Sequence, residues 1–89
     1  MAKLIYSQRF ADELLDVYSP RIKKQIDNIL FFLEMSPESG SKNVADSLVQ
    51  EFGDDIRKFA IGPFDLVYQY FPEKDEVYVY TLIHQKLAW

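Results

Sequence analysis

The sequence contains no cysteine and only one histidine, one tryptophan and three glycines among its 89 residues. The absence of cysteine excludes disulfides, thiolate zinc sites and a cysteine nucleophile. A single histidine is too few for a histidine-rich metal site. The chain also has no glycine-rich phosphate loop and no serine-centred triad. We therefore expect a protein that holds neither a metal nor an organic cofactor.

Long apolar segments are missing as well. The longest nearly apolar run, Ile29–Leu33, is far shorter than the roughly 20 residues that cross a bilayer. The N-terminus lacks the cationic and then apolar pattern of a secretion signal. These absences favour a cytoplasmic protein that does not contact a membrane. With 48% hydrophobic and 27% charged residues, the chain is predicted to fold as one small domain spanning residues 1–89.

Charge is unevenly distributed along the chain. The net charge is -4, so the protein as a whole does not attract nucleic acid electrostatically. Residues 3–24 carry a local charge of +2, residues 25–55 carry -6, and residues 56–89 are neutral. Any anion-binding patch must therefore be local and come from the first or last third. The acidic middle third is either a solvated face or a surface for a basic partner.

The first half of the sequence predicts one short strand and two helices. Lys3–Tyr6 is apolar and β-capable, and Ser7 is placed to cap a helix after it. Ser19 and Pro20 repeat the start signal. Apolar residues then keep the helical period until Ser36, at Ile22, Ile26, Ile29, Leu30 and Leu33. Residues 36–55 are interpreted as a partly ordered connection.

The last third changes to a strand-like pattern. Residues 56–61, 65–71 and 76–84 are rich in β-branched and aromatic side chains and are separated by turn signals, which predicts a three-stranded antiparallel meander. The expected order is β-α-α-β-β-β. This is an α+β fold in which a helical hairpin packs on one face of a small, mainly antiparallel sheet.

Loop lengths predict the register of these strands. A two-residue loop places Ile61 opposite Phe64, and a four-residue loop places Phe71 opposite Glu76, so cross-strand neighbours share a face. The face expected under the helices carries Phe59, Ile61, Leu66, Tyr68, Val77, Val79, Thr81 and Ile83. The face expected to point outward carries Lys58, Asp65, Val67, Gln69, Tyr78, Tyr80, Leu82 and His84, with Arg57 at the end of the sheet.

The outward face has the ingredients of an RNA-binding surface. Tyr78 and Tyr80 offer rings on which bases can stack, while Lys58 and Gln69 offer polar contacts. His84 is a candidate general acid or base. Two cations are candidates for stabilising charge on a cleaved phosphate, Arg57 and Lys86. The alternative is structural, because tyrosines fit a pleated surface and a lone histidine often lies on an edge.

Two further charged clusters have both a functional and a structural interpretation. Arg21, Lys23 and Lys24, at the start of the second predicted helix, either contact nucleic acid or an acidic partner or form a solvated helix face. Asp12, Glu13 and Asp16 either hold a divalent cation or form the wet side of an amphipathic helix.

Four segments together resemble a known family. Ile5–Leu15, Ile26–Leu33, Ile56–Tyr68 and Val77–His84 resemble, in order and spacing, a RelE/ParE-type toxin, and the resemblance covers nearly the whole chain. It implies the toxin half of a bacterial type II toxin-antitoxin module, held inactive by an antitoxin that wraps the toxin. One branch of the family cleaves mRNA without metal, often on the ribosome. The ParE-like branch inhibits DNA gyrase by binding it.

The resemblance transfers residue by residue with one departure. Arg57 matches the basic residue of the family's second strand and has Lys58 beside it, while His84 and Lys86 match the end of the last strand, where cleaving members carry proton-transfer and phosphate-stabilising groups. Position 65, usually arginine, is Asp65 here. A carboxylate on the sheet face repels a scissile phosphate. Together with the net acidity, it favours a protein-binding inhibitor of a target such as gyrase.

Two alternatives remain open at this point. One is a metal-independent mRNA endoribonuclease in which Arg57 and Lys86 stabilise the phosphate and His84 transfers a proton. The other is a degenerate homologue that only binds its antitoxin. The antitoxin is expected in the groove between the two helices and the sheet, together with Leu87 and Trp89. Trp89 either folds back onto the domain or anchors this partner.

Overall fold

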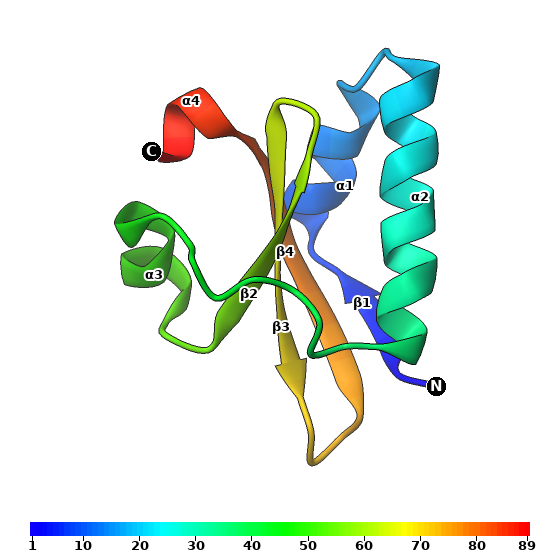
Figure 1. The fold of residues 1–89 in the computed structure, drawn as a ribbon, viewed down its shortest axis with the longest axis vertical. Helices are drawn as coiled ribbons and strands as arrows, with labels where there is room; N and C mark the ends of the chain where they lie inside the picture. The colour runs from blue at the N-terminus through cyan, green and yellow to red at the C-terminus, as the bar shows by residue number, and fades with distance from the viewer.

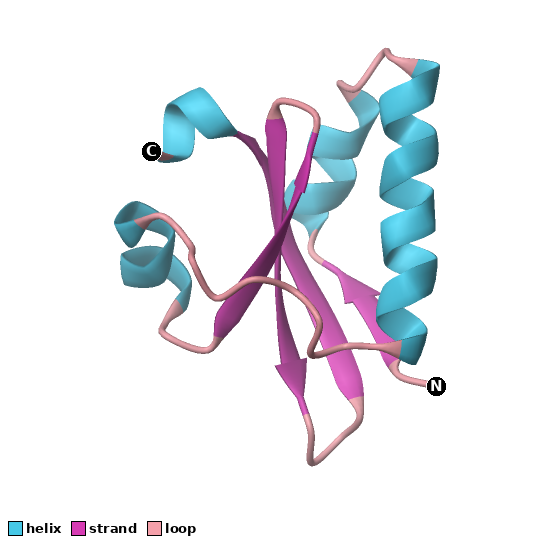
Figure 2. Ribbon diagram, in the orientation of Figure 1, coloured by secondary structure: helices cyan, strands magenta, loops and turns pink.

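A mixed four-stranded sheet runs through the middle of the molecule and separates two groups of helices (Figure 1, Figure 2). The computed structural model describes residues 1–89. In chain order the elements are β1 (Lys3–Tyr6), α1 (Gln8–Leu15), α2 (Pro20–Met35), α3 (Asp46–Phe52), β2 (Ile56–Ile61), β3 (Phe64–Phe71), β4 (Glu76–His84) and α4 (Gln85–Ala88). The predicted α+β fold, with a helical hairpin on one face of the sheet, is confirmed. None of its helices has the length and apolarity to cross a membrane.

Both predicted helix starts are capped as expected. The Ser7 hydroxyl accepts a hydrogen bond from the Phe10 amide at 2.9 Å, and the Ser19 hydroxyl accepts one from the Ile22 amide at 3.3 Å. Pro20 occupies the first turn of α2, where its missing N–H leaves no hydrogen bond unmade. These caps fix where α1 and α2 begin, and therefore which of their side chains face the sheet.

The main core lies between the helical hairpin and the sheet. α2 contributes Ile22, Ile26, Leu30 and Leu33 to it. Fully burying an aliphatic side chain of this size stabilises the fold by about 1.5–3 kcal/mol. We call the side of the sheet that packs against α1 and α2 the inner face, and the opposite side the outer face.

The strand order is β1-β4-β3-β2, with β1 parallel to β4 and the remaining pairs antiparallel. The two register predictions are confirmed, since Ile61 pairs with Phe64 and Phe71 pairs with Glu76. β1 pairs with only part of β4, and Glu13 of α1 covers the edge of β4 where β1 has ended. Its carboxylate accepts hydrogen bonds from the Leu82 amide at 2.9 Å and from the Thr81 hydroxyl.

A β-bulge in β4 makes part of the face assignment wrong. Tyr68 pairs with Val79 and Val67 pairs with Thr81, so Tyr80 is an extra residue on β4. One extra residue reverses the alternation of the side chains that follow it. Leu82 therefore packs in the inner core and Ile83 against the outer cluster, the reverse of the prediction. Thr81 and His84 also change sides, because they pair with Val67 and Phe64.

The outer face is not open as predicted, because α3 and α4 cover part of it (Figure 1). A second core of buried side chains forms there from Val44, Ala45, Leu48, Ile56, Val67 and Ala88. The 36–55 segment, expected as a connection, thus contains the helix α3. No side chain caps its first turn, so the usual sequence signal for a helix start is missing.

Candidate functional site

A buried carboxylate organises the outer face beneath the C-terminus. Asp65 has 0% of its surface exposed. Its Oδ2 lies 3.6 Å from Lys58 Nζ and accepts a hydrogen bond from Trp89 Nε1 at 3.0 Å, and its Oδ1 accepts one from Gln85 Nε2 at 3.2 Å. We call these four residues the Asp65 cluster. The cluster joins β2 and β3 to α4 and to the last residue of the chain.

Lys58 has little freedom to bind a ligand. Its side chain is largely buried, its Nζ lies against Asp65, and the same Nζ lies 4.7 Å from the centroid of the Trp89 ring. The positive charge of a lysine held by both a carboxylate and an aromatic ring is compensated by these partners. The predicted nucleic-acid or target-binding role of Lys58 therefore requires the Asp65 cluster to open first.

Two expectations about this region are corrected, one about Asp65 and one about the groove, and one of the two alternatives for Trp89 is observed. Asp65 lies on the outer face as predicted, but it is buried and paired, so it presents no bare charge that could repel a phosphate. Trp89 folds back onto the domain through its N–H, although 61% of its surface remains exposed. The predicted groove is wrong in one respect, because Leu87 and Trp89 lie across the sheet from α1 and α2 (Figure 1).

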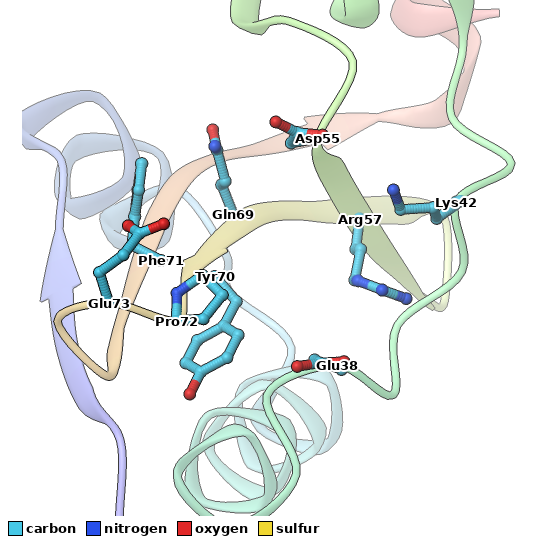
Figure 3. Close-up of a pocket in the computed structure, with 9 residues that line it drawn as sticks. All are labelled: Glu38, Lys42, Asp55, Arg57, Gln69, Tyr70, Phe71, Pro72 and Glu73. Carbon is cyan, nitrogen blue, oxygen red and sulfur yellow. The ribbon is translucent and has the colours of Figure 1, made fainter.

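Arg57 lies at the mouth of a different cavity. It pairs with Tyr68 across β2 and β3, and its Nη1 donates a hydrogen bond to the Gly40 carbonyl at 3.1 Å. The cavity has a volume of about 440 Å³ and is lined by polar and charged side chains. Figure 3 shows Arg57 extending from β2 between Lys42 and Glu38. Arg57 forms none of the ion pairs in the molecule, so its charge remains available.

Gly40 and Tyr68 fix the chain segment that holds Arg57. The Gly40 amide donates a hydrogen bond to the Tyr68 hydroxyl at 2.9 Å, and any side chain at position 40 would collide with that hydroxyl. Burial raises the pKa of Tyr68 above its ordinary value of 10.0. A neutral Tyr68 hydroxyl is therefore maintained as the acceptor for Gly40.

His84 has a structural role at the end of β4. It caps α4, where its Nδ1 accepts a hydrogen bond from the Lys86 amide at 3.2 Å, and its ring packs edge-on against Phe64. Because Nδ1 is an acceptor, the ring's other nitrogen carries the proton in the neutral form. The Lys86 side chain points into solvent on α4.

The predicted catalytic residues do not come together. Arg57 lies across from Tyr68 and His84 across from Phe64, and β2 and β4 lie on opposite sides of β3. Four residues along β3 correspond to about 13 Å. This separation is far longer than the reach of one phosphate group. Lys86 follows His84 on α4 and is likewise remote from Arg57.

Three of the predicted binding residues do come together on the outer face. Tyr80 Oη donates a hydrogen bond to Gln69 Oε1 at 2.9 Å, and the Tyr78 ring centroid lies 5.0 Å from that of Tyr80. Phe52 of α3 stacks on Tyr80 at 4.6 Å between ring centroids. Burial, and then the neighbouring Tyr78, raise the pKa of Tyr80 above 10.0. We call Phe52, Gln69, Tyr78 and Tyr80 the aromatic face.

The sequence does not identify Phe52 or Gln85 as members of these clusters. Phe52 falls in the segment interpreted as a connection, although Leu48, Val49 and Phe52 are spaced for one helix face, which was the available signal. Gln85 follows the last strand without any pattern around it. The role of Gln85 depends on its hydrogen bond to Asp65. No local sequence pattern predicts this tertiary contact.

Comparison with known proteins places this geometry in a family. Residues 4–89 match the family model described as the ParE toxin of the type II toxin-antitoxin system parDE. The isolated RelE toxin of E. coli has a similar structure, with a TM-score of 0.71 and 20% identity over 94% of this chain and 84% of that chain. The intact E. coli RelBE toxin-antitoxin complex contains a chain that matches with a TM-score of 0.70 and 20% identity, covering 92% of this chain and 94% of that chain.

A third similar structure comes from another bacterium. The RelBE2 toxin-antitoxin complex of Mycobacterium tuberculosis matches with a TM-score of 0.72 and 18% identity, over 94% of this chain and 98% of that chain. At these identities the structural matches establish the fold. No curated protein sequence matches the chain.

Proposed function

Because the chain belongs to the ParE toxin family of type II toxin-antitoxin systems, we propose that it acts by binding and inhibiting an essential protein, with DNA gyrase as the target that the family resemblance implies. The observation that carries the proposal is the separation of Arg57 from His84 by four residue pairs along β3. Cleavage of RNA requires the proton-transfer group and the phosphate-binding cation to reach the same phosphate. The folded chain keeps them apart.

The outer face offers a suitable protein-binding surface. Tyr78 and Tyr80 are half-buried, with their rings in tilted contact. On the same side of the sheet, Leu87 of α4 and Trp89, which follows α4, are exposed. Tyrosine and tryptophan are enriched among the residues that dominate binding energy at protein interfaces. The target is proposed to contact the aromatic face.

The antitoxin is proposed to engage α4. Two of the similar structures, one from E. coli and one from M. tuberculosis, are toxin-antitoxin complexes, and this supports a cognate antitoxin for this chain. Leu87 lies on a helix of only four residues and Trp89 follows that helix directly. Both are exposed, so a partner can cover them without disturbing the main core. Co-purification with the antitoxin is expected to weaken when both residues are changed to alanine.

The test of the target is a DNA supercoiling assay with purified gyrase, combined with a pull-down. The wild-type chain and the Arg57→Ala/His84→Ala variant are both expected to bind gyrase and inhibit it. Tyr78→Ala is expected to weaken both effects, while Leu15→Ala, which removes an exposed side chain on α1, serves as the matched control. Absence of binding and inhibition at micromolar toxin would rule the proposal out.

A metal-independent endoribonuclease is the second candidate, and one observation favours it. Arg57 borders a polar cavity and is bound to no carboxylate, so its guanidinium can receive a phosphate. Under this alternative, the purified chain cleaves mRNA in the presence of a chelator, and Arg57→Ala abolishes cleavage without unfolding the protein. A folded chain with neither activity would point to a homologue that only binds its antitoxin.

A further inference from the structure

The aromatic rings on the outer face form a row that ends at a cavity. Phe52, Tyr80 and Tyr78 contact one another in that order, with ring centroids 4.6 Å and 5.0 Å apart. Tyr78 also lines a cavity of about 270 Å³, together with Ile5 of β1 and Phe71 of β3. We call it the Tyr78 cavity. Figure 1 shows α3 and α4 at the side of the sheet away from β1, so these helices leave the cavity open.

The strand register explains why the apolar walls of the Tyr78 cavity share the outer face. Ile5 pairs with Tyr78 across β1 and β4, and Gln69 pairs with Tyr78 across β3 and β4. Cross-strand partners point to the same side of a sheet, and Phe71 lies two residues after Gln69 on the same strand. Ile5, Phe71 and Tyr78 are half-buried. Three neighbouring strands therefore each contribute one large side chain to the cavity.

The remaining two residues of the lining carry opposite charges. They are Lys74, in the exposed turn after β3, and Glu76, at the start of β4. Neither forms an ion pair within the chain. An apolar centre inside a polar, solvated rim is typical of the sites that dominate binding energy at protein interfaces. Since the two charges cancel, the cavity favours an uncharged and apolar ligand group.

The volume of the Tyr78 cavity fits one aromatic side chain. A closed cavity of about 150 Å³ with apolar walls binds benzene, and the Tyr78 cavity is larger, at about 270 Å³. Phe71 and Tyr78 each offer a ring against which another ring can pack edge to face. A nucleobase has a similar size, but Glu76 at the rim and the net charge of -4 both repel its phosphate. An aromatic side chain of a protein meets neither repulsion.

We propose that the Tyr78 cavity receives one aromatic side chain of the target protein and so anchors the target on the aromatic face. This inference rests on the proposed function, because it names the chemical group with which the target contacts that face. A row of rings supplies contact area to many partners. A cavity that holds a single side chain adds specificity, because the target must place an aromatic residue at that point.

The first experiment titrates the isotope-labelled chain with N-acetyl-phenylalaninamide, an uncharged probe with one phenyl ring, and follows the amide signals by NMR. Saturable shifts centred on Ile5, Phe71 and Tyr78 are expected, with a dissociation constant in the millimolar range for a ligand of this size. N-acetyl-alaninamide, which lacks the ring, is the control and should cause no saturable shift. The proposal is overturned if the phenyl probe gives no saturable shifts at these residues, or if adenosine monophosphate binds there more tightly.

The second experiment fills the cavity from within. Ile5→Phe places a ring in the space and is expected to weaken binding of the phenyl probe at least tenfold, with circular dichroism confirming the fold. Ile5→Val leaves the cavity open and is the matched control. In a pull-down with purified gyrase, Ile5→Phe should also lose at least tenfold in affinity relative to Ile5→Val.

The two experiments separate this inference from the choice of target. If the wild type binds both the probe and gyrase, and the two Ile5 variants bind gyrase equally, the Tyr78 cavity is not the anchor and the inference is overturned. If the wild type binds the probe but not gyrase, gyrase is overturned as the target, while the assignment of a ring-binding cavity is supported.

Discussion

Asp65 holds the C-terminal segment on the sheet through charge and hydrogen bonds at once. Its two oxygens receive Lys58, Gln85 and the indole N–H of Trp89. A buried carboxylate is stable only when such partners compensate for its lost hydration. The position that the family resemblance assigns to an arginine thus carries an internal link in this chain, and the charge near it is largely cancelled.

Changing Asp65 to alanine is expected to destabilise the protein by about 2–4 kcal/mol, because Lys58 and the Trp89 N–H lose their buried partner together. Urea unfolding gives the loss. Fluorescence of Trp89, the single tryptophan, should shift to the red as α4 detaches. Asp16→Ala, which removes an exposed carboxylate, is the control. An unchanged stability and emission would show that the Asp65 cluster does not hold α4.

The raised pKa of Tyr68 leads us to expect that the protein loses stability at alkaline pH. Burial raises the pKa of Tyr68 in the folded state above 10.0, so the unfolded chain releases the proton more readily. The stabilisation is complete below pH 10 and is lost as the pH rises through the folded-state pKa. Tyr68→Phe should therefore lower stability at neutral pH, where the Gly40 hydrogen bond is lost, yet flatten the alkaline decline. Urea midpoints measured across this range would reveal the difference in slope.

At the scale of elements, what could be predicted was encoded locally. Ser7 and Ser19 have the residue types that cap helices, and the loops after β2 and β3 have lengths that fix register. These signals act within a few residues, so tertiary contacts did not override them. The starts of α1 and α2 and the pairing of β2, β3 and β4 at their hairpin ends followed from them.

The elements that were missed depend on contacts between distant residues. No glycine or proline near Tyr80 indicates a bulge in the sequence. The Ser7 hydroxyl donates a hydrogen bond to the carbonyl of the bulged Tyr80 at 2.6 Å. The short helices α3 and α4 are stabilised by burying Leu48 and Ala88 against the sheet rather than by their own propensity. For this reason the placement of His84, four residues after the bulge, could not be predicted.

Ser7 joins two elements, and this gives a prediction at their scale. Its hydroxyl caps α1 through Phe10 and also donates to the bulged Tyr80, whereas Ser19 only caps α2. Ser7→Ala is expected to cost about 2 kcal/mol and Ser19→Ala about 1 kcal/mol or less. Urea unfolding of the two variants provides a direct comparison, since both remove the same atom. Equal losses would mean that the bond to the bulge contributes nothing.

For the whole molecule, the sheet divides the chain into two functional sides. The inner face, α1 and α2 form the larger core. On the outer face of the sheet, beside and beneath the short helices, lie the residues of the aromatic face and the Asp65 cluster. Gln69, Tyr78 and Tyr80 could be grouped from sequence because they precede or lie at the bulge. Arg57 and His84 could not be separated, because residue type alone does not report distance.

The separation of Arg57 from His84 determines the result expected in a living cell. Inducing the wild-type chain without antitoxin should arrest bacterial growth, and the Arg57→Ala/His84→Ala variant should arrest it equally, because inhibition by binding does not need these two residues. Viable counts after induction measure the effect, with circular dichroism confirming that both proteins fold. A Tyr78→Ala/Tyr80→Ala variant, which removes both tyrosine rings of the aromatic face, should relieve the arrest. Arrest that disappears only in the Arg57→Ala/His84→Ala variant would instead place the activity with the ribonuclease branch of the family.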